Sequence, residues 1–457
     1  MASVRGGTAG TAVAAGAAVA IAMTLAGGRV ALAQVAPPAP TTLAVGDWQI
    51  APLAQVRARG EYRYDLLAHD QWMLLERARL GADALDGPVE ARVVLQDARA
   101  LSLGDAAIGP DYTPASTFTG AYEAWAEAHT GIRNTSFVRV GRQPVEWGEG
   151  RILGTDDWSA AGRSLDAARA RVTTGDGAFE LLGAVLVDPA VPNALANYGE
   201  LFGGRAAWTF DPLLAIEGYF LWRVAHQRPL LDDDGSVEGR TGVGALRVHG
   251  NGHGWVYAAE GAYELGHADV PNLERSAFAA AAHVSKQLET IVWQPTLGVS
   301  GSYASGGSSG SHFTTFEPIL PDAHRWHGLL DLVTWSNEVD VGGSVHASPW
   351  QDGDVGVEYR YLRLADPGGA WTGGYLETIG LPDPGNTKGE LGHEIDATVR
   401  WSPWAPVDFA AGYGLLVVSD GARKLVNGPF PPDNVTLLAH KPSLVHSGYL
   451  QVTLAVP

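Results

Sequence analysis

The sequence predicts an all-β protein: a single antiparallel transmembrane β-barrel of eighteen strands. Three observations predict this fold. Apolar and polar residues alternate along many short runs, the polar positions in these runs are often charged, and the connections between runs alternate between short and long. A period of two places successive side chains on opposite faces of a strand. An apolar outer face around a charged interior is typical of a membrane barrel.

The first run, at residues 48–64, shows the two faces clearly. Val56, Ala58 and Tyr62 fall on one face, and Arg57 and Arg59 fall on the other. The second face is too charged for the core of a soluble protein, because burying unpaired charge is costly. We therefore expect the arginines to point into a polar lumen and the apolar residues to contact lipid.

The same alternation continues to the end of the chain. Most runs are close to the roughly 9–11 residues that a tilted strand needs to cross a bilayer. An even number of strands is typical of bacterial single-chain barrels. We predict strands over residues 48–60, 70–82, 88–98, 118–129, 136–143, 165–173, 178–187, 204–210, 213–223, 241–249, 254–265, 277–286, 294–304, 338–347, 354–364, 393–402, 407–418 and 444–456.

The connections between these strands have a regular asymmetry. Counted from the first strand, the even-numbered connections hold only a few residues, as at 83–87 and 174–177. Most odd-numbered connections are much longer; they cover roughly residues 99–117, 144–164, 188–203, 224–240, 305–337, 365–392 and 419–443. Short periplasmic turns and long extracellular loops are typical of outer-membrane barrels. A soluble β-sandwich has no reason to follow this pattern.

Composition is compatible with this fold but does not decide it. The 457 residues are 46% hydrophobic and 18% charged, with 58 glycines, 27 prolines and no cysteine. After the N-terminus, no apolar run approaches the roughly 20 residues of a membrane helix. Fifteen tryptophans and 14 tyrosines could form girdles at the membrane interfaces. Secreted β-sandwiches that bind carbohydrate are also rich in these residues, so a soluble β protein stays the alternative at this level.

The first residues have the features of a targeting segment. Arg5 precedes an apolar stretch over residues 11–26, and Ala31-Leu32-Ala33 matches the small-x-small pattern of a cleavage site. We predict a cleaved signal peptide over residues 1–33, a short lead-in over 34–47 and the barrel over 48–457. A retained membrane anchor is the alternative, but the glycines at 27 and 28 interrupt the apolar stretch.

Several stretches resemble the alginate-export porin family of Gram-negative outer membranes. The most specific one is VGRQPVEWGEGRILG at residues 140–154, followed by DW at 157–158 and GRSLD at 162–166. Further matching stretches occur in the same order along nearly all of the predicted mature chain; they are QDAR at 96–99, YASG at 303–306, PILP at 318–321, GHEID at 392–396 and GYG at 412–414.

The resemblance implies an eighteen-stranded barrel in the cell outer membrane, with an arginine-rich constriction that passes an anionic polysaccharide by passive transport. It also implies an inner-membrane synthase and periplasmic export-complex proteins as partners, since a barrel has no energy source. We expect a monomer that contacts outer-membrane lipid. A formal net charge of −19 argues against nucleic acid as a partner. A porin for small anions or nutrients of unrelated chemistry is the alternative function.

Passage of a uronate polymer needs positive charge confined to the lumen. Arginine suits this task because it stays charged and binds carboxylates through a planar fork. Residues predicted from the strand register to line the pore are Arg57, Arg59, Arg77, Arg79, Arg92, Arg169, Arg171, Arg223, Arg360 and Arg400. The resemblance adds Arg142, Arg151 and Arg163, with Glu146 and Asp166 as their partners. The alternative interpretation is that these arginines only stabilise the barrel by pairing with acids.

The remaining motifs favour neither an enzyme nor a cofactor. Residues 306–310 (GGSSG) match a nucleophile-elbow pattern formally, but they form a Gly/Ser tract without the strand and helix that the motif needs. His324 and His327 lie three residues apart, where an exposed or packed pair is a simpler interpretation than a metal site. The acidic run at 232–234 could bind calcium at a loop tip. We expect no other cofactor and no catalytic residue.

Overall fold

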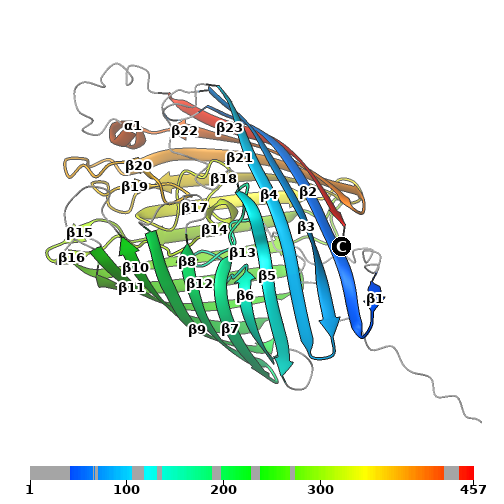
Figure 1. Ribbon diagram of the computed structural model, residues 1–457. Helices are drawn as coiled ribbons and strands as arrows, with labels where there is room; N and C mark the ends of the chain where they lie inside the picture. The colour runs from blue at the N-terminus through cyan, green and yellow to red at the C-terminus, as the bar shows by residue number, and fades with distance from the viewer. Residues whose placement is uncertain are drawn as a thin grey trace, which may run out of the picture.

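A computed structural model describes residues 42–64, 66, 70–104, 118–130, 136–187, 197–227, 237–267, 273–426 and 442–456. Eighteen long strands form one closed antiparallel barrel (Figure 1). They are β2 (Trp48–Tyr64), β3 (Asp70–Asp86), β4 (Val89–Gly104), β5 (Phe118–Thr130), β6 (Ser136–Gln143), β7 (Leu165–Thr174), β8 (Gly177–Val187), β9 (Asn197–Asp211), β10 (Leu214–Gln227), β11 (Val237–Gly252), β12 (Trp255–His267), β13 (Glu274–Gln287), β14 (Thr296–Ala304), β17 (Glu338–Ala347), β18 (Gly353–Arg363), β21 (Glu390–Trp404), β22 (Val407–Val418) and β23 (Leu444–Val456).

Each long strand pairs with its neighbours in chain order, and the last strand closes the sheet on the first. β23 pairs with β2 from Ala54↔Val456 to Tyr64↔His446. The predicted barrel of eighteen strands is therefore confirmed, and every predicted strand overlaps an observed one. Several strands run longer than predicted, because their pairing continues past the apolar alternation that marks the membrane. β11, for example, pairs with β10 over residues 237–249.

Short strands and helices lie outside the eighteen long strands. β1 (Leu43–Val45) lies in the predicted lead-in and pairs with the start of β2. Figure 1 shows β1 close to the C-terminus, whereas α1 (Asp420–Val426) lies at the opposite end. The other short elements are β15 (Ser308–Ser309), β16 (His312–Phe313), β19 (Trp371–Thr372), β20 (Thr378–Gly380) and the 3-10 helix η1 (Ala323–Arg325). The predicted signal peptide lies outside the described residues.

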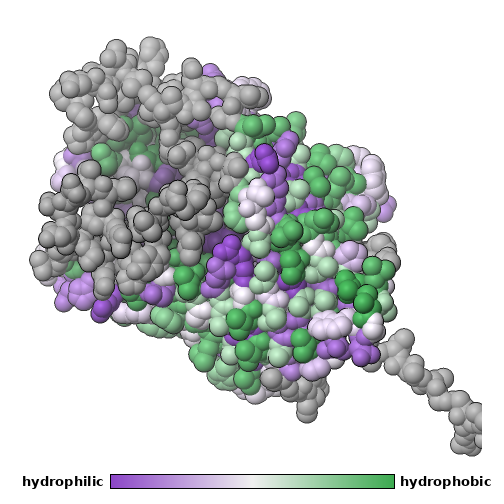
Figure 2. Space-filling model, viewed as in Figure 1, coloured by the Kyte–Doolittle hydropathy of each residue, from purple (hydrophilic) through white to green (hydrophobic). Residues whose placement is uncertain are grey.

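The outer face of the barrel is apolar, as the alternation predicts. Large hydrophobic side chains such as Leu80, Leu181 and Leu450 are about two-thirds exposed or more, and Figure 2 shows many hydrophobic residues on the wall that faces the viewer. Trp208, Trp255 and Trp404 are exposed near the short-turn end, where aromatic side chains suit a membrane interface. In the described part of the chain, no helix is long and apolar enough to span a bilayer.

Two of the long loops fold into the lumen instead of extending away from it. Loop 144–164, between β6 and β7, and loop 305–337, between β14 and β17, bury Trp147, Ile152 and Phe316 against inward residues of the wall. A second apolar cluster joins Leu330 of loop 305–337 to α1 and to the loop-side ends of β18, β21, β22 and β23. Packed segments therefore narrow the lumen.

Candidate functional site

Arginines on β2 and β3 hold loop 144–164 in the lumen. Arg77 donates to both carboxylate oxygens of Asp157 at 2.8 and 3.1 Å, and Arg79 donates to Oδ1 at 3.1 Å. Arg57 donates to the carbonyl oxygens of Asp157 and Ser159, each at 2.6 Å. These strands alternate so that each arginine points inward, and the loop covers them until they are almost fully buried. We call these three arginines and Asp157 the arginine clamp.

Electrostatics at the arginine clamp favour the ionised carboxylate. Burial acts to raise the pKa of Asp157, but the charges of Arg77, Arg79 and Arg57 outweigh it and lower the pKa to about 2. Next to it, burial raises the pKa of Asp156 to about 7, although Arg163 partly opposes the shift. Three guanidinium groups share the one carboxylate of Asp157, so positive charge is in excess at this wall.

Acidic residues on other strands hold the same two loops through backbone amides. Glu217 of β10 accepts from the backbone N–H of Gly148 at 2.9 Å, and Glu394 of β21 accepts from Leu330 at 3.0 Å. Asp396 accepts from the backbone N–H of Leu329 at 3.2 Å. The charged wall thus holds the loops by their backbones, with arginines on carbonyls and carboxylates on amides.

Glycine allows the close approach of the loops to these carboxylates. Gly148 has a φ of +63° and Gly328 has a φ of +90°, both in the left-handed region that favours glycine. A Cβ on Gly328 would lie 2.4 Å from Oε1 of Glu394, and a Cβ on Gly148 would lie 2.7 Å from Oε1 of Glu260. Glycine is therefore favoured at both positions for two reasons: the backbone has a positive φ, and there is no room for a Cβ atom.

The two inward loops are also joined to each other. Leu153 and Leu320 form a parallel bridge, with backbone hydrogen bonds on either side of it. Arg163 donates to the carbonyl oxygens of Gly154, Leu320 and Pro321 at 2.8–3.1 Å. The loops therefore form one unit that crosses the lumen.

An aromatic group lies at the edge of this unit. The ring of Trp158 stacks on His324 with centroids 3.7 Å apart and meets Tyr449 of β23 edge-on at 4.9 Å. The guanidinium carbon of Arg59 lies 3.6 Å from the centre of the Trp158 ring. His324 and Arg59 thus cover the two faces of the Trp158 ring, and this group joins the arginine-rich wall to loop 305–337.

A pocket lies between η1 and the wall formed by β17, β18 and β21. Its charged and titratable lining residues are His324, Arg325, His346, Glu358, Arg360 and Asp396. Arg325 bonds Glu146 of the other inward loop at 2.9 and 3.0 Å, and Arg360 donates to Asp340 at 2.6 Å. The pocket therefore has charges of both signs.

The predicted pore residues do not all gather in one place. Arg57, Arg59 and Arg77 lie at the arginine clamp with Arg79, and Arg151 and Arg163 lie in the inward loop. Arg92 pairs with Asp83, and Arg169 pairs with Glu180. Three further arginines are half-buried, and each lies on the inward face of its strand; they are Arg171, Arg223 and Arg400.

Arg142 and Asp166 differ from the prediction. They pair with each other at 2.6 Å, but Arg142 shares its face of β6 with the exposed residues Val138 and Val140. Alternation along the strand therefore places the pair on the outer face, where we expected the lumen. Glu146 pairs with Arg325 and not with one of the three arginines expected from the resemblance.

Several important residues were absent from the predicted set. Asp157 and Trp158 stood in the quoted motif DW, but their role depends on contacts with strands about a hundred residues away. Arg325 follows the PILP stretch and had no signal of its own. The only signal in the sequence was the charge of the arginines on β2 and β3, which indicates that they need an acidic partner but not which residue it is.

The secondary motifs have structural roles or fall outside the described residues. His324 bonds Asp331 at 2.7 Å and His327 contacts Asp340 at 3.2 Å, so each histidine has its own carboxylate partner. Burial lowers the pKa of His327, although Asp340 opposes the shift. The possible calcium loop at 232–234 lies outside the described residues.

Comparison with known families agrees with this geometry. A family model described as Alginate export matches residues 53–426, from β2 to the end of α1. The chain belongs to the alginate export family. Members of the alginate export family are channels, so this barrel is a channel of the Gram-negative outer membrane and not an enzyme. No curated protein matches the chain in sequence.

Solved structures of outer-membrane channels are similar in fold to this alginate export family member. OccAB1 of Acinetobacter baumannii has a TM-score of 0.60 at 9% identity, with 89% of this chain and 96% of that chain covered. OccD3 (OpdP) of Pseudomonas aeruginosa has a TM-score of 0.57 at 11% identity, with 92% and 93% covered. OpdK of the same species, solved with vanillate, has a TM-score of 0.55 at 11% identity, with 89% and 98% covered. At such low identity the likeness shows the fold alone.

Proposed function

We propose that this outer-membrane channel passes an anionic polysaccharide or oligosaccharide, such as an alginate-like uronate, by passive transport. The observation that carries the proposal is the arginine clamp, where three guanidinium groups share one carboxylate. The excess positive charge lies inside a low-dielectric wall, which focuses the field onto the lumen. A chain with one carboxylate per sugar would be drawn toward this wall.

The arginines of the clamp act through their field because loop 144–164 covers them. Direct contact with the solute falls to less buried cations, such as Arg163 of the same loop and Arg400 of β21. Contacts of this kind should be weak and spread along the path, since a tight site would stall transport.

A porin for small anions is the second candidate. The observation that favours it is the joined pair of inward loops, which leaves a pocket lined by Arg325, His324 and His346 together with acids. A narrow path of this kind suits a small solute as well as a single extended polymer. Charge selectivity alone cannot separate the two candidates, whereas solute length can.

The test is single-channel recording of the purified protein in a planar bilayer. We expect anion-selective conductance that oligouronates block in part, with stronger block as the oligomers lengthen. Neutral oligosaccharides of the same lengths are the control for size. Cation selectivity, or equal block by charged and neutral oligomers, would contradict an anionic solute. Block by a uronate monomer that does not increase with length would favour the small-anion porin.

Export of a polymer also requires partners, because diffusion through a barrel has no energy source. Under this proposal, periplasmic export-complex proteins deliver the polymer to the short-turn end of a monomeric barrel. Cross-linking from the short turns in intact cells, followed by identification of the linked proteins, tests this part. Recovery of no periplasmic protein from cells that are secreting polymer would contradict it.

A further inference from the structure

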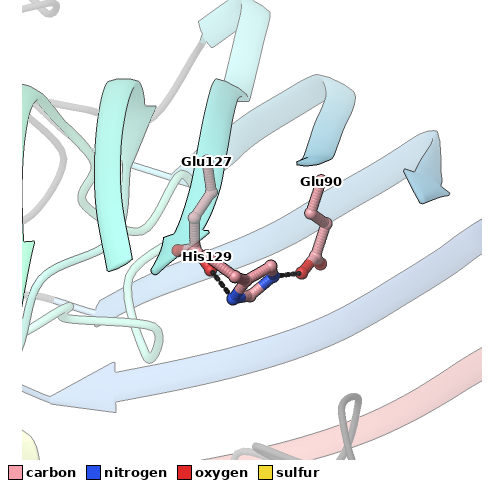
Figure 3. Close-up of side chains that lie close together, drawn as sticks. All are labelled: Glu90, Glu127 and His129. Atoms are coloured by element: carbon pink, nitrogen blue, oxygen red, sulfur yellow. Dashed lines mark hydrogen bonds and ion pairs between the residues drawn. The ribbon is translucent and has the colours of Figure 1, made fainter. Parts of the chain in front are cut away.

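A small polar cluster lies inside the barrel at its short-turn end, away from the inward loops. It consists of Glu90 near the start of β4 and of Glu127 and His129 near the end of β5 (Figure 3). Alternation along both strands places the three side chains on the inward face. His129 Nε2 lies 3.3 Å from Oε2 of Glu90, and its Nδ1 lies 3.2 Å from Oε1 of Glu127.

The strand register brings like charges together in this cluster. Glu90 and Glu127 are direct partners across the β4–β5 ladder, an arrangement that destabilises a sheet. In a neighbouring row a cation faces the acid, as in Asp83↔Arg92, and on its other side Glu127 faces Arg139 of β6. Arg139 Nε donates a hydrogen bond of 2.6 Å to Oε2 of Glu127, and Oε1 stays available. With a neutral imidazole, the two glutamates and Arg139 therefore have a net charge of −1.

The imidazole of His129 cannot satisfy both carboxylates while it is neutral, because it then has one N–H. The contact with Glu90 has hydrogen-bond geometry, so Nε2–H donates to Glu90. The other nitrogen, Nδ1, is sealed from solvent and has no hydrogen-bond partner, yet it faces Oε1 of Glu127. Two acceptor atoms therefore lie 3.2 Å apart without a hydrogen bond between them, and a cation bound by both would remove the repulsion.

We propose that Glu127 and His129 bind a divalent transition-metal ion, with Zn²⁺ as the reference ion. The separation of 3.2 Å between Nδ1 and Oε1 is that of two ligands at about 2.0–2.1 Å from one tetrahedral ion. Glu90 accepts the proton of the other ring nitrogen, as carboxylates commonly do behind a metal-bound histidine. A mixed nitrogen and oxygen ligand set favours Zn²⁺ or Ni²⁺ over Ca²⁺ and Mg²⁺.

The experiment is calorimetric titration of the untagged, detergent-solubilised full chain with Zn²⁺ after chelator treatment. We expect one saturable site per barrel. His129→Ala should abolish it, and Glu90→Gln, which removes a residue that only orients the imidazole, should weaken it about tenfold or more. Glu90→Gln also serves as the informative variant if His129→Ala does not fold. His312→Ala is the matched control, since His312 lies 3.7 Å from Glu274 in an exposed pair; it should leave the affinity unchanged.

Two results would overturn the proposal. One is the absence of saturable Zn²⁺ binding to the folded wild-type barrel. The other is wild-type affinity in both His129→Ala and Glu90→Gln. Either result would be accompanied by an unfolding temperature that Zn²⁺ leaves unchanged at neutral pH.

Discussion

The wall at β2 and β3 and the wall at β21 hold the same loop unit with residues of opposite charge. On the first wall, Arg57 and Arg77 bind carbonyl oxygens and the Asp157 carboxylate of loop 144–164. On the second, Glu394 and Asp396 accept backbone N–H groups of loop 305–337. The first contact pairs full charges, whereas the second pairs a carboxylate with neutral amides.

Loop 144–164 is therefore held mainly by ion pairs, and loop 305–337 mainly by hydrogen bonds to its backbone amides. Asp157 is surrounded by cations, so removal of its charge should leave buried guanidinium groups uncompensated. Glu394 lies beside another carboxylate, Asp396, so removal of its charge should relieve repulsion while the amide keeps an acceptor oxygen. We therefore expect the contacts on the first wall to depend on charge, and those on the second wall to depend only on an acceptor oxygen in the right place.

The strongest test of this comparison is a matched pair of isosteric variants. Asp157→Asn should destabilise the barrel by about 3–5 kcal/mol, because it breaks a buried ionic cluster. Glu394→Gln should change stability by less than about 1 kcal/mol, because the hydrogen bond from Leu330 can persist. Unfolding can be followed by the temperature at which the heat-modifiable band shifts on a denaturing gel. Equal losses in the two variants would show that the two walls do not differ in this way.

The pH dependence of stability sharpens the same comparison within loop 144–164. The pKa of Asp157, about 2 in the folded protein, is below its ordinary value of about 3.9. Its contribution of about 2–3 kcal/mol is present above pH 4 and is lost as the pH falls toward 2. Asp156, with a pKa of about 7, behaves in the opposite way, and its contribution is lost as the pH rises from 4 to 7.

Unfolding temperatures measured across this range should show both effects. Asp156→Asn should reduce the decline between pH 4 and 7, and Asp157→Asn should reduce the decline below pH 4. The two variants serve as controls for each other because the residues are adjacent in the chain. An unchanged profile in both variants would contradict the assigned shifts.

A smaller effect is expected at the close approach to the acidic wall. Gly328→Ala should cost about 1–2 kcal/mol, because the residue has a positive φ and its new Cβ would contact Glu394. Gly261→Ala is the control, since a Cβ there meets open space. Denaturant titration of the two variants measures the difference. A loss in the control as large as that in Gly328→Ala would point to general sensitivity of the barrel to alanine.

The smallest effect is expected outside the lumen. Arg142→Ala removes a partly exposed pair on the outer face, so stability should fall by less than about 1 kcal/mol. Ion selectivity in a planar bilayer should not change. Arg163→Gln is the comparison variant, because Arg163 lies in the lumen. If Arg142→Ala reduced anion selectivity as much as Arg163→Gln does, Arg142 would have to line the pore.

The strands were predictable because their signal is local. Alternation along β2 was enough to place Arg57 and Arg59 inside and Val56 outside. Alternation along β6 also places Arg142 outside, so the expectation from the family motif was wrong where the register was informative. The arginine clamp was not predictable, since Arg57 and Asp157 are 100 residues apart. Long-range contacts of this kind have no period in the sequence.

Trp158 has a consequence for how the protein is assembled. It lies over Arg59 of β2 and against Tyr449 of β23, the two strands that meet where the cylinder shuts. The first and last long strands of the barrel thus share one side chain from the loop between β6 and β7. A nascent barrel that seals with this ring excluded would lose both contacts. Insertion of the loop and closure of the seam therefore depend on contacts of the same ring.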